Sequence, residues 1–243
     1  MDLSEVNLLN HFRHPWELSR RDSLLRILKK NGKDIQYGDV GAGDLFFTKA
    51  LSKITTRPVY AVDPYFKDTT SIKNIILLKN FDAIPQKCLD FLLLMDVLEH
   101  IEDERVLISS LTDKLKYSGM ILITVPAFKF LYSQHDCFLK HYRRYNQSDI
   151  LSLLGRDFEV EECFYFYTIL FFARFMGNVL LRFRKKQNIQ FGVNNWKYNE
   201  TRIVTKIIKY VLDVDFKVNK YLSKFRIKLP GLSLCVICQK KSV

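Results

Sequence analysis

The residues Gln36-Tyr-Gly-Asp-Val-Gly-Ala-Gly-Asp44 close a predicted strand and open a predicted helix. Glycines at such a turn let the backbone approach a ligand closely, and the helix N-terminus favours the negative groups of that ligand. A dinucleotide-binding G-x-G-x-x-G turn would place a third glycine at position 46, where this chain has Phe46. The turn therefore indicates a nucleotide-like ligand and disfavours a bound pyrophosphate, although tight turns also use glycines without any ligand.

A second signal lies 20 residues after Gly43, where the apolar stretch Val59-Tyr-Ala-Val ends in Asp63. In nucleotide-binding α/β units an acid at about this distance binds the ribose, because a carboxylate accepts two hydrogen bonds from a diol. The alternative is an ordinary strand-end acid that caps a turn. Together with the glycine turn, this acid favours the ribose role.

Apolar runs alternate with segments of helical length on both sides of these signals, which predicts a parallel sheet covered by helices on both faces. The runs FLLLM (91–95) and ILITV (121–125) are apolar at every position, as strands buried on both faces are. We expect Gly119 to supply the turn before the second run. The predicted strands are 35–40, 59–62, 74–78, 89–95, 120–125, 158–163 and 232–238, and the predicted helices of this part are 16–30, 44–53 and 103–117.

The last third of the chain lacks the regular alternation of apolar runs and helical segments. Residues 164–181 are strongly apolar and aromatic, but the run is short for a membrane span and has Arg174 near its centre, so we predict a buried or interface-lying helix. Residues 201–225 form a second amphipathic helix. Between Arg182 and Lys228 there are 13 basic and 3 acidic residues. The region 164–229, which we call the insert, is predicted to be a lid over the core, a dimer interface or a platform on a membrane surface.

The composition sets broad limits on partners and compartment. A net charge of +12 favours an anionic partner such as nucleic acid, phosphorylated lipid or an anionic membrane face, although it also aids solubility alone. Five scattered cysteines do not make a disulfide framework, and the pair Cys235 and Cys238 lacks the further ligands of a zinc site. Residues 1–13 do not resemble a signal peptide, so a cytoplasmic protein is expected.

Three motifs together resemble the class I S-adenosylmethionine-dependent methyltransferases: D-V-G-A-G-D (39–44), V-D (62–63) and L-M-D-V-L-E-H-I-E-D (94–103). The segments 14–22, 135–136, 141–145 and 230–240 are similar to a bacterial branch of that family, with an H-D-x4-H-x-R-R-Y loop. The resemblance implies one domain over 1–243, with a Rossmann-like, doubly wound and mostly parallel seven-stranded sheet. Residues 1–33 would carry a helix that covers the cofactor, and residues 164–229 would form the basic and aromatic helical insert before the last strand.

The resemblance also assigns cofactor roles to positions of this sequence. Asp39, Gly41 and Gly43 would hold the methionine end of S-adenosylmethionine, whose reaction product is S-adenosylhomocysteine. Asp63 would bind the ribose hydroxyls. The remaining contacts fall on three other segments of the chain.

The segment Asn80-Phe81-Asp82 would flank the adenine, with the contacting residue left open. Met95 and Asp96 would form a wall at the end of the fourth strand. Trp16 and Arg20 would cover the cofactor from the N-terminal helix, and Trp16 has the alternative role of packing that helix.

The loop after the fifth strand carries the candidate catalytic residues. Ligands of open α/β sheets bind beyond the carboxyl ends of the strands, so this loop faces the transferring methyl group. A histidine whose pKa is near neutrality suits a general base, which makes His135 the first candidate and His141 the second. Arg143 and Arg144 are predicted to bind substrate, because guanidinium groups match phosphate and carboxylate, and the adjacent Tyr145 is assigned to substrate with them. The alternative is that these arginines form salt bridges that order the loop.

Asp96, Glu99, His100 and His135 raise the question of a divalent metal. Some ubiquinone-pathway O-methyltransferases and small-RNA 2′-O-methyltransferases carry a similar cluster that binds magnesium or manganese. The V-L-E-H motif also occurs in many members with no known metal. No metal ligand is therefore assigned from the sequence.

The resemblance and the basic insert together predict the reaction. We expect transfer of a methyl group to an oxygen, with nitrogen less favoured, of an anionic glycan or lipid-linked precursor at the cytoplasmic membrane face. The bacterial branch often accompanies surface-polysaccharide synthesis, which supports this by analogy only. The alternatives are a small-molecule or quinone-type O-methyltransferase and an RNA-modifying methyltransferase, although no RNA-binding module is visible. A peripheral contact with an anionic membrane and a homodimer through the insert are further expectations.

Overall fold

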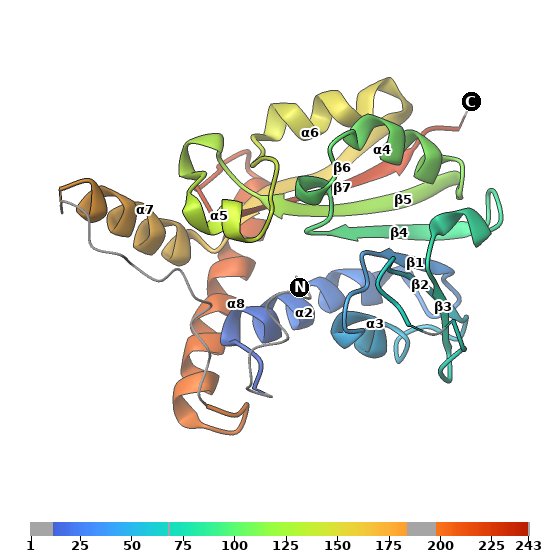
Figure 1. Ribbon diagram of the computed structural model, residues 1–243, viewed down its shortest axis with the longest axis horizontal. Coiled ribbons are helices and arrows are strands. Elements are labelled where there is room, and N and C mark those ends of the chain that lie inside the picture. The colour runs from blue at the N-terminus through green and yellow to red at the C-terminus, as the bar shows by residue number, and fades with distance from the viewer. Residues whose placement is uncertain (1–11, 68, 184–197, 243) are drawn as a thin grey trace.

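The protein is built on one seven-stranded sheet. The computed structural model describes residues 12–67, 69–183 and 198–242, with the side chains of 178–183 left aside. The strand order is β3-β2-β1-β4-β5-β7-β6, in which β1 to β5 are parallel and β7 runs antiparallel to both of its neighbours (Figure 1). This confirms the predicted fold class. The strands are β1 (Tyr37–Val40), β2 (Val59–Val62), β3 (Ile75–Leu78), β4 (Leu89–Met95), β5 (Leu115–Pro126), β6 (Phe158–Phe166) and β7 (Ser233–Lys240).

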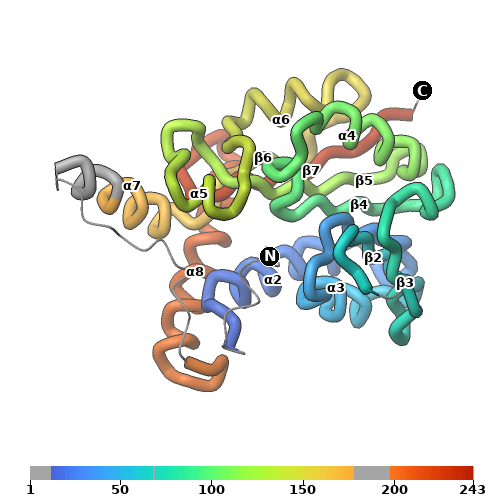
Figure 2. Tube along the Cα trace, viewed as in Figure 1, coloured from blue at the N-terminus to red at the C-terminus, as the bar shows by residue number. Residues whose placement is uncertain are grey.

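Helices cover both faces of the sheet, as the alternation of apolar runs predicts. The helices on the two faces can be followed in Figures 1 and 2. On one face two helices pack against the sheet through Leu111 and Ile150, and on the other face three helices pack against it through Leu28, Leu51 and Phe216. The first pair is α4 (Glu104–Thr112) and α6 (Gln147–Leu154), and the second group is α2 (Pro15–Leu28), α3 (Phe46–Leu51) and α8 (Ile203–Ser223). The other helices are α5 (Gln134–Phe138), α7 (Thr168–Phe183) and the 3₁₀ turns η1 (Lys29–Asn31), η2 (Phe81–Ala83), η3 (Leu98–His100), η4 (Lys129–Leu131) and η5 (Gly155–Asp157).

Helix α2 begins at a capping box and is tied to α8. His14 and Glu17 cap its N-terminus reciprocally, and Pro15 occupies a first-turn position where its missing N–H costs nothing. Its apolar side packs into the core, while its polar side forms ion pairs with α8. Lys209 Nζ lies 2.9 Å from Asp22, and an arginine of α2 pairs with an aspartate of α8 in the same way. The N-terminal helix is thereby held over the end of the sheet where a ligand would bind.

Three local sequence predictions are wrong. The predicted helix 103–117 ends at Thr112, and its last three residues belong to β5, which begins at Leu115. The sequence predicts that the aromatic helix starts at residue 164, but the sixth strand continues to Phe166. The strand is longer because Phe164 and Phe166 pair with β7 and bury their rings in the core. The helix α7 begins only after Tyr167, whose φ of 65° turns the chain. Gly119 lies inside β5 and not before it, in a tight stretch where the positive φ belongs to Ser118.

The predicted helical insert does lie between the last two strands, as α7 and α8. Its first three residues belong to β6, and part of its basic stretch lies outside the described residues. Across the described ranges, none of the helices combines the length and the apolar character that crossing a membrane requires.

Replacing Gly231 by alanine is expected to destabilise the fold strongly. A Cβ at this position would lie 2.3 Å from the carbonyl oxygen and 2.5 Å from the amide nitrogen of Phe166, so the backbone itself must move. Overpacking of this kind costs about 1–3 kcal/mol, which lowers the Tm of a chain of this length by roughly 2–10 °C. The matched control is Gly177→Ala, because a Cβ there meets nothing within 4 Å. Equal melting temperatures for the two variants would contradict a close contact between Gly231 and the end of β6.

Candidate functional site

The carboxyl end of β1 carries the glycine turn. Gly41 has a φ of 78° and Gly43 a φ of 54°, the left-handed region in which glycine is at ease. A Cβ on Gly41 would lie 2.4 Å from Cγ2 of Val97, so the turn also packs directly against the segment after β4. The amides of Gly41 and Ala42 both donate to the carbonyl of Val62 at the end of β2. The turn is thus fixed between the two neighbouring strand ends.

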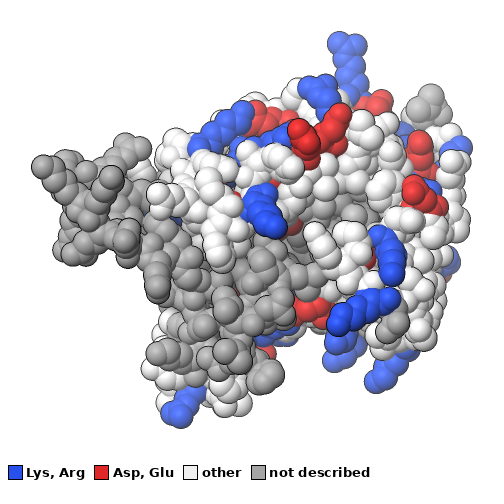
Figure 3. All heavy atoms as spheres, in the orientation of Figure 1, with Lys and Arg blue, Asp and Glu red and all other residues white. Residues whose placement is uncertain are grey.

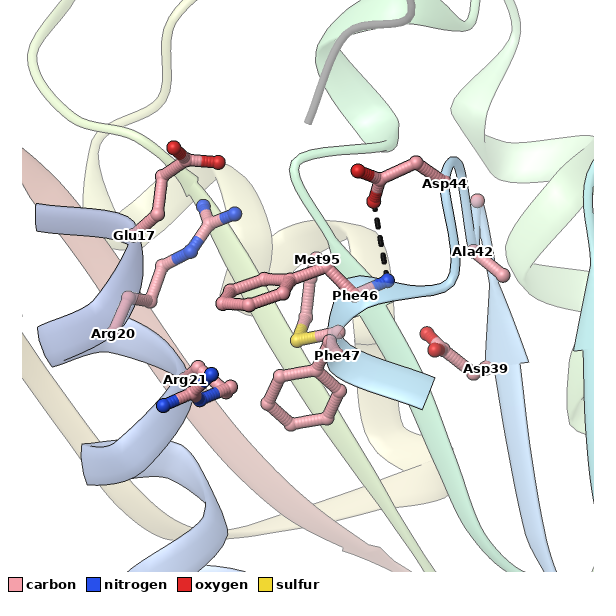
Figure 4. Close-up of a pocket in the computed structure, with 10 residues that line it drawn as sticks. Glu17, Arg20, Arg21, Asp39, Ala42, Asp44, Phe46, Phe47 and Met95 are labelled. Atoms are coloured by element: carbon pink, nitrogen blue, oxygen red, sulfur yellow. Dashed lines mark hydrogen bonds between the residues drawn. The ribbon is translucent and has the colours of Figure 1, made fainter. Parts of the chain in front are cut away.

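A pocket opens beside this turn, between α2 and the start of α3. Figure 4 shows the side chains of Arg20 and Arg21 projecting from α2 toward Phe46, Phe47 and Met95. The residues that line it are Glu17, Arg20, Arg21, Asp39, Gly41, Ala42, Asp44, Phe46, Phe47 and Met95. Five of the sequence-predicted cofactor residues (Arg20, Asp39, Gly41, Met95 and, one residue further, Asp96) therefore lie at or beside one pocket.

Asp39 is buried with one oxygen unused. Its Oδ2 accepts a hydrogen bond of 2.6 Å from Thr48 Oγ1, while its Oδ1 has no partner in the described part of the chain. Burial raises the pKa of Asp39 to about 6, an effect that the hydrogen bond from Thr48 opposes only in part. A buried carboxylate oxygen without a partner, at the wall of a pocket, suits a cationic group such as the ammonium of an amino acid.

Asp63 connects the two sequence signals. Its Oδ2 accepts a hydrogen bond of 2.8 Å from the Gly43 amide, and its Oδ1 accepts one of 3.0 Å from the Tyr65 amide. The contacts are those of a strand-end acid that caps turns, and each oxygen keeps a lone pair for a further donor. The ribose role stays a prediction. Of the predicted adenine segment, Asn80 and Asp82 are exposed and Phe81 is half-buried against the core, and none of the three lines the pocket.

Arg20 of α2 reaches the end of β4, and Trp16 lies beside it. The guanidinium of Arg20 forms an ion pair with Asp96 and lies 4.9 Å from the centre of the Trp16 ring. Asp96 has a φ of 55° and also accepts a hydrogen bond of 3.2 Å from Thr124. Burial alone would raise the pKa of Asp96, but Arg20 outweighs it and holds the pKa below its ordinary value. The guanidinium of Arg20 and the ring of Trp16 thus lie at the end of β4.

Sequence reasoning missed the contacts of Phe46, which lines this pocket. Two guanidinium groups contact its ring, with the Arg13 carbon 4.3 Å and the Arg21 carbon 4.7 Å from the ring centre. Arg13 also forms an ion pair with Asp44 of the glycine turn. The signal that was available is the aromatic ring at position 46 itself, where a dinucleotide site needs a glycine.

Residues 9–178 match the sequence profile of a family described as "Methyltransferase domain", which is more than half of the chain. The chain belongs to this methyltransferase family. It is a class I, S-adenosylmethionine-dependent methyltransferase, and S-adenosylmethionine is its cofactor, with S-adenosylhomocysteine as the product. The more specific bacterial branch is a resemblance of local motifs only.

Solved structures of other methyltransferases share the fold. An S-adenosylmethionine-dependent methyltransferase from Archaeoglobus fulgidus is 19% identical, with a TM-score of 0.53 over 93% of this chain and 94% of that one. A putative sarcosine dimethylglycine methyltransferase from Galdieria sulphuraria is 13% identical, with a TM-score of 0.56 over 95% and 91%. Phosphoethanolamine N-methyltransferase 2 from Haemonchus contortus, solved with S-adenosylmethionine, is 17% identical, with a TM-score of 0.52 over 91% of this chain and 53% of that one. No curated protein sequence matches the methyltransferase.

The affinity of the methyltransferase for S-adenosylmethionine is expected to fall below pH 6. If Asp39 binds the cofactor ammonium, it must be ionised to do so, and burial raises its pKa in the free protein to about 6. Protons therefore compete with the cofactor below that pH, and the dissociation constant should rise by about tenfold for each further unit of acidification. Calorimetric titrations between pH 5 and 8 would measure this. Asp39→Asn is expected to bind weakly with no slope in that window, and a wild-type affinity that stays constant from pH 5 to 8 would exclude Asp39 as the ammonium ligand.

The loop after β5 is organised by a fully buried carboxylate, Asp136. Its Oδ1 accepts hydrogen bonds from Arg144 Nε at 2.8 Å and lies 3.3 Å from His141 Nδ1, while its Oδ2 accepts one of 3.1 Å from Arg174 of α7. Ser133 completes a capping box with Asp136 at the start of α5. Burial disfavours the ionised form, but the hydrogen bond with His141 and the two arginines outweigh it and hold the pKa of Asp136 well below its usual range.

The predicted substrate residues make contacts within the protein. Arg143 forms an ion pair with Glu104 and donates a hydrogen bond of 2.8 Å to the Glu102 carbonyl. Arg144 is buried and also donates to the Ala127 carbonyl. Tyr145 is buried, and its hydroxyl has no partner among the described residues. These contacts are the ones that the loop-ordering alternative requires, and the substrate role of the three residues stays a prediction.

The two candidate base residues have different surroundings. His135 is half-buried, and burial together with the charge of Arg174 lowers the pKa of this imidazole. It is therefore neutral at pH 7 and able to accept a proton. His141 instead contacts Asp136, and its ring meets the His100 ring edge-on, with 4.7 Å between the centres. Neither histidine lines the pocket beside the glycine turn, and the base role of each stays a prediction.

One cluster of the methyltransferase has the composition of a metal site. Ligand atoms of Glu99, His100 and His141 all lie within 4.8 Å of one another. Glu99 is buried, neither of its carboxylate oxygens has a hydrogen-bond partner among the described residues, and burial with the nearby Asp96 raises its pKa well above the usual range. Two imidazoles and a carboxylate fit a divalent transition metal. His141 lies with Glu99 and His100, whereas the sequence raised His135 as a possible third member without assigning a metal ligand.

Proposed function

We propose that the methyltransferase transfers the methyl group to a hydroxyl oxygen of an anionic, lipid-linked or glycan precursor at the cytoplasmic face of the membrane, with a nitrogen acceptor as the less favoured variant. The observation that carries this proposal is an exposed aromatic surface beside the loop of His135. Phe130, Phe172 and Phe175 are 59%, 52% and 39% exposed, and α7 projects from the body of the molecule (Figure 1). Exposed apolar surface of this kind marks contact with a membrane, an apolar ligand or a partner.

The reaction needs alignment and one proton acceptor. In the proposed step His135 takes the proton of the acceptor hydroxyl as the oxygen forms a bond to the methyl carbon. The bond between that carbon and sulfur breaks, its electron pair stays on sulfur, and S-adenosylhomocysteine leaves. Because the sulfonium is already activated, holding the oxygen in line with it supplies much of the acceleration. His135→Ala is accordingly the variant that tests the base.

A second amphipathic surface supports contact with an anionic membrane. Helix α8 exposes large apolar side chains along its length, including Ile203 at 73% and Tyr210 at 69%, next to Lys206 and Lys217. A helix that combines an apolar face with lysines lies in a lipid interface, held by burial of the apolar face and by attraction to anionic headgroups. On the face drawn in Figure 3, basic side chains lie among acidic and neutral ones.

A small-molecule or quinone-type O-methyltransferase is the second candidate, and the cluster of Glu99, His100 and His141 favours it. A divalent ion there would act as a Lewis acid on an acceptor oxygen. Complete loss of methyl transfer on chelation, restored by Mn²⁺ or Zn²⁺, would move the assignment to this candidate. Activity that is indifferent to chelation would leave the first proposal in place.

The acceptor class is tested by methyl transfer from labelled S-adenosylmethionine into a fractionated cell extract, with Asp63→Ala as the control. The proposal expects label in the organic-extractable or glycan fraction, and none with the variant. Label in RNA or in small polar molecules would overturn it in favour of one of the alternatives. The membrane part is tested separately by sedimentation with vesicles, where failure of anionic vesicles to retain the protein at low salt would remove it.

A further inference from the structure

We propose that Arg174 of α7 binds the anionic group of the acceptor, a phosphate or a carboxylate, beside His135. The sequence alone places Arg174 as an unexplained charge within an apolar helix. The inference rests on the proposed function, because it takes the acceptor to be an anion carried on an apolar chain.

The guanidinium of Arg174 is held by two acceptors and has one buried donor without a partner among the described residues. Its Nη2 donates to Ser133 Oγ at 2.8 Å and to Asp136 Oδ2 at 3.1 Å. Its Nε is buried and has no hydrogen-bond partner within the described ranges, while the side chain as a whole is 21% exposed. A buried cationic donor without a partner is costly, so such a group calls for an acceptor that an anionic ligand would supply.

The charges around this position leave an excess of positive charge. Asp136 is shared between two guanidinium groups, those of Arg144 and Arg174. Arg144 is only 4% exposed, and its guanidinium forms an ion pair with Asp136 and donates a hydrogen bond to the Ala127 carbonyl. Arg143, the other arginine of the loop, is paired with Glu104. Among these three arginines, Arg174 alone combines access to solvent with an unpartnered buried donor.

The apolar surroundings of Arg174 fit the rest of such an acceptor. Phe171 and Phe175 lie three residues before and one residue after Arg174, so all three share one side of α7. Their rings are parallel to within 7° with 6.2 Å between centres, and Phe130 meets both rings edge-on. A cation beside stacked aromatic rings binds a molecule that has both an apolar chain and a negative headgroup.

Calorimetric binding of decyl phosphate, below its micelle concentration, to the full chain saturated with S-adenosylhomocysteine tests the inference. We expect Arg174→Met to weaken binding by about 10–100-fold, as loss of a charge-assisted hydrogen-bonding group does. Arg174→Lys should be intermediate, because it keeps the charge and loses the planar donor set. Arg57→Met, which removes a surface arginine paired with Asp34, is the matched control and should bind as the wild type does. Decanoate in place of decyl phosphate distinguishes a carboxylate site from a phosphate site.

Two further measurements separate recognition from a structural role. Ser133→Ala removes one anchor of the guanidinium but keeps the cation, so it should reduce decyl phosphate affinity far less than Arg174→Met. The uncharged decyl glucoside should bind the wild type and Arg174→Met equally. Wild-type protein that binds neither anion, or Arg174→Met that binds them unchanged, would overturn the inference. Failure of the proposed acceptor class shows separately, as label in the wrong cell fraction, and leaves this binding result standing.

Discussion

Replacing Asp136 by alanine is expected to lower the free energy of unfolding by about 3–5 kcal/mol, because removal of one partner of a buried ion pair leaves the other charges uncompensated. Asp136 is fully buried, and Arg144 beside it is 4% exposed, so solvent cannot replace the lost carboxylate. The same change frees His141 and Arg174, and the loop after β5 should lose its fixed conformation. Thermal unfolding followed by circular dichroism measures the first effect, and methyl transfer measures the second.

The control for this variant is Asp34→Ala, which removes a carboxylate that is 73% exposed and pairs with Arg57 on the surface. Exposed pairs of this kind contribute little, so its unfolding transition should match that of the wild type. If Asp136→Ala and Asp34→Ala unfold at the same temperature, the buried network around Asp136 does not hold the loop.

Replacing Asp63 by alanine is expected to weaken binding of S-adenosylmethionine by about 100-fold or more, since two charge-assisted hydrogen bonds to the ribose would be lost. The variant also removes the acceptors of the Gly43 and Tyr65 amides, which loosens the glycine turn. Equilibrium binding of labelled cofactor to purified protein gives the affinity.

Asp63→Asn separates the two effects. Its amide oxygen can still accept a hydrogen bond from the turn, whereas the charge and one acceptor are gone, so we expect an affinity between those of the wild type and Asp63→Ala. If both variants bind the cofactor as tightly as the wild type, Asp63 caps turns and does not hold the ribose.

Two of the strands that are apolar on both faces could be predicted to the residue, whereas β5 begins at Leu115, five residues before its predicted start. β2 and β4 have the predicted bounds because continuous apolar runs with turn residues on both sides leave few other conformations. The aromatic stretch after Cys163 was misjudged, since an all-apolar segment fits a buried strand and a buried helix equally well. Only pairing of Phe164 and Phe166 with β7 decides between them.

Which residues share the pocket could be predicted better than the contacts of the loop after β5, for a similar reason. Asp39 and Gly41 belong to one short motif, so neighbouring positions in the sequence bring both to the pocket. The role of Arg143 depends on Glu104, and that of Arg174 depends on Asp136, each 38 or more residues away along the chain. Such partners become visible only when the fold brings the segments together.

The central claim is that the pocket between α2 and the glycine turn holds the cofactor. A crystal structure of the methyltransferase with S-adenosylhomocysteine tests it most directly. We predict that the amino group of the ligand lies within hydrogen-bond distance of Asp39 Oδ1, with the ribose hydroxyls on Asp63 and the sulfur facing the loop of His135. A ligand bound elsewhere, or one bound here without contact to Asp39 and Asp63, would contradict the account.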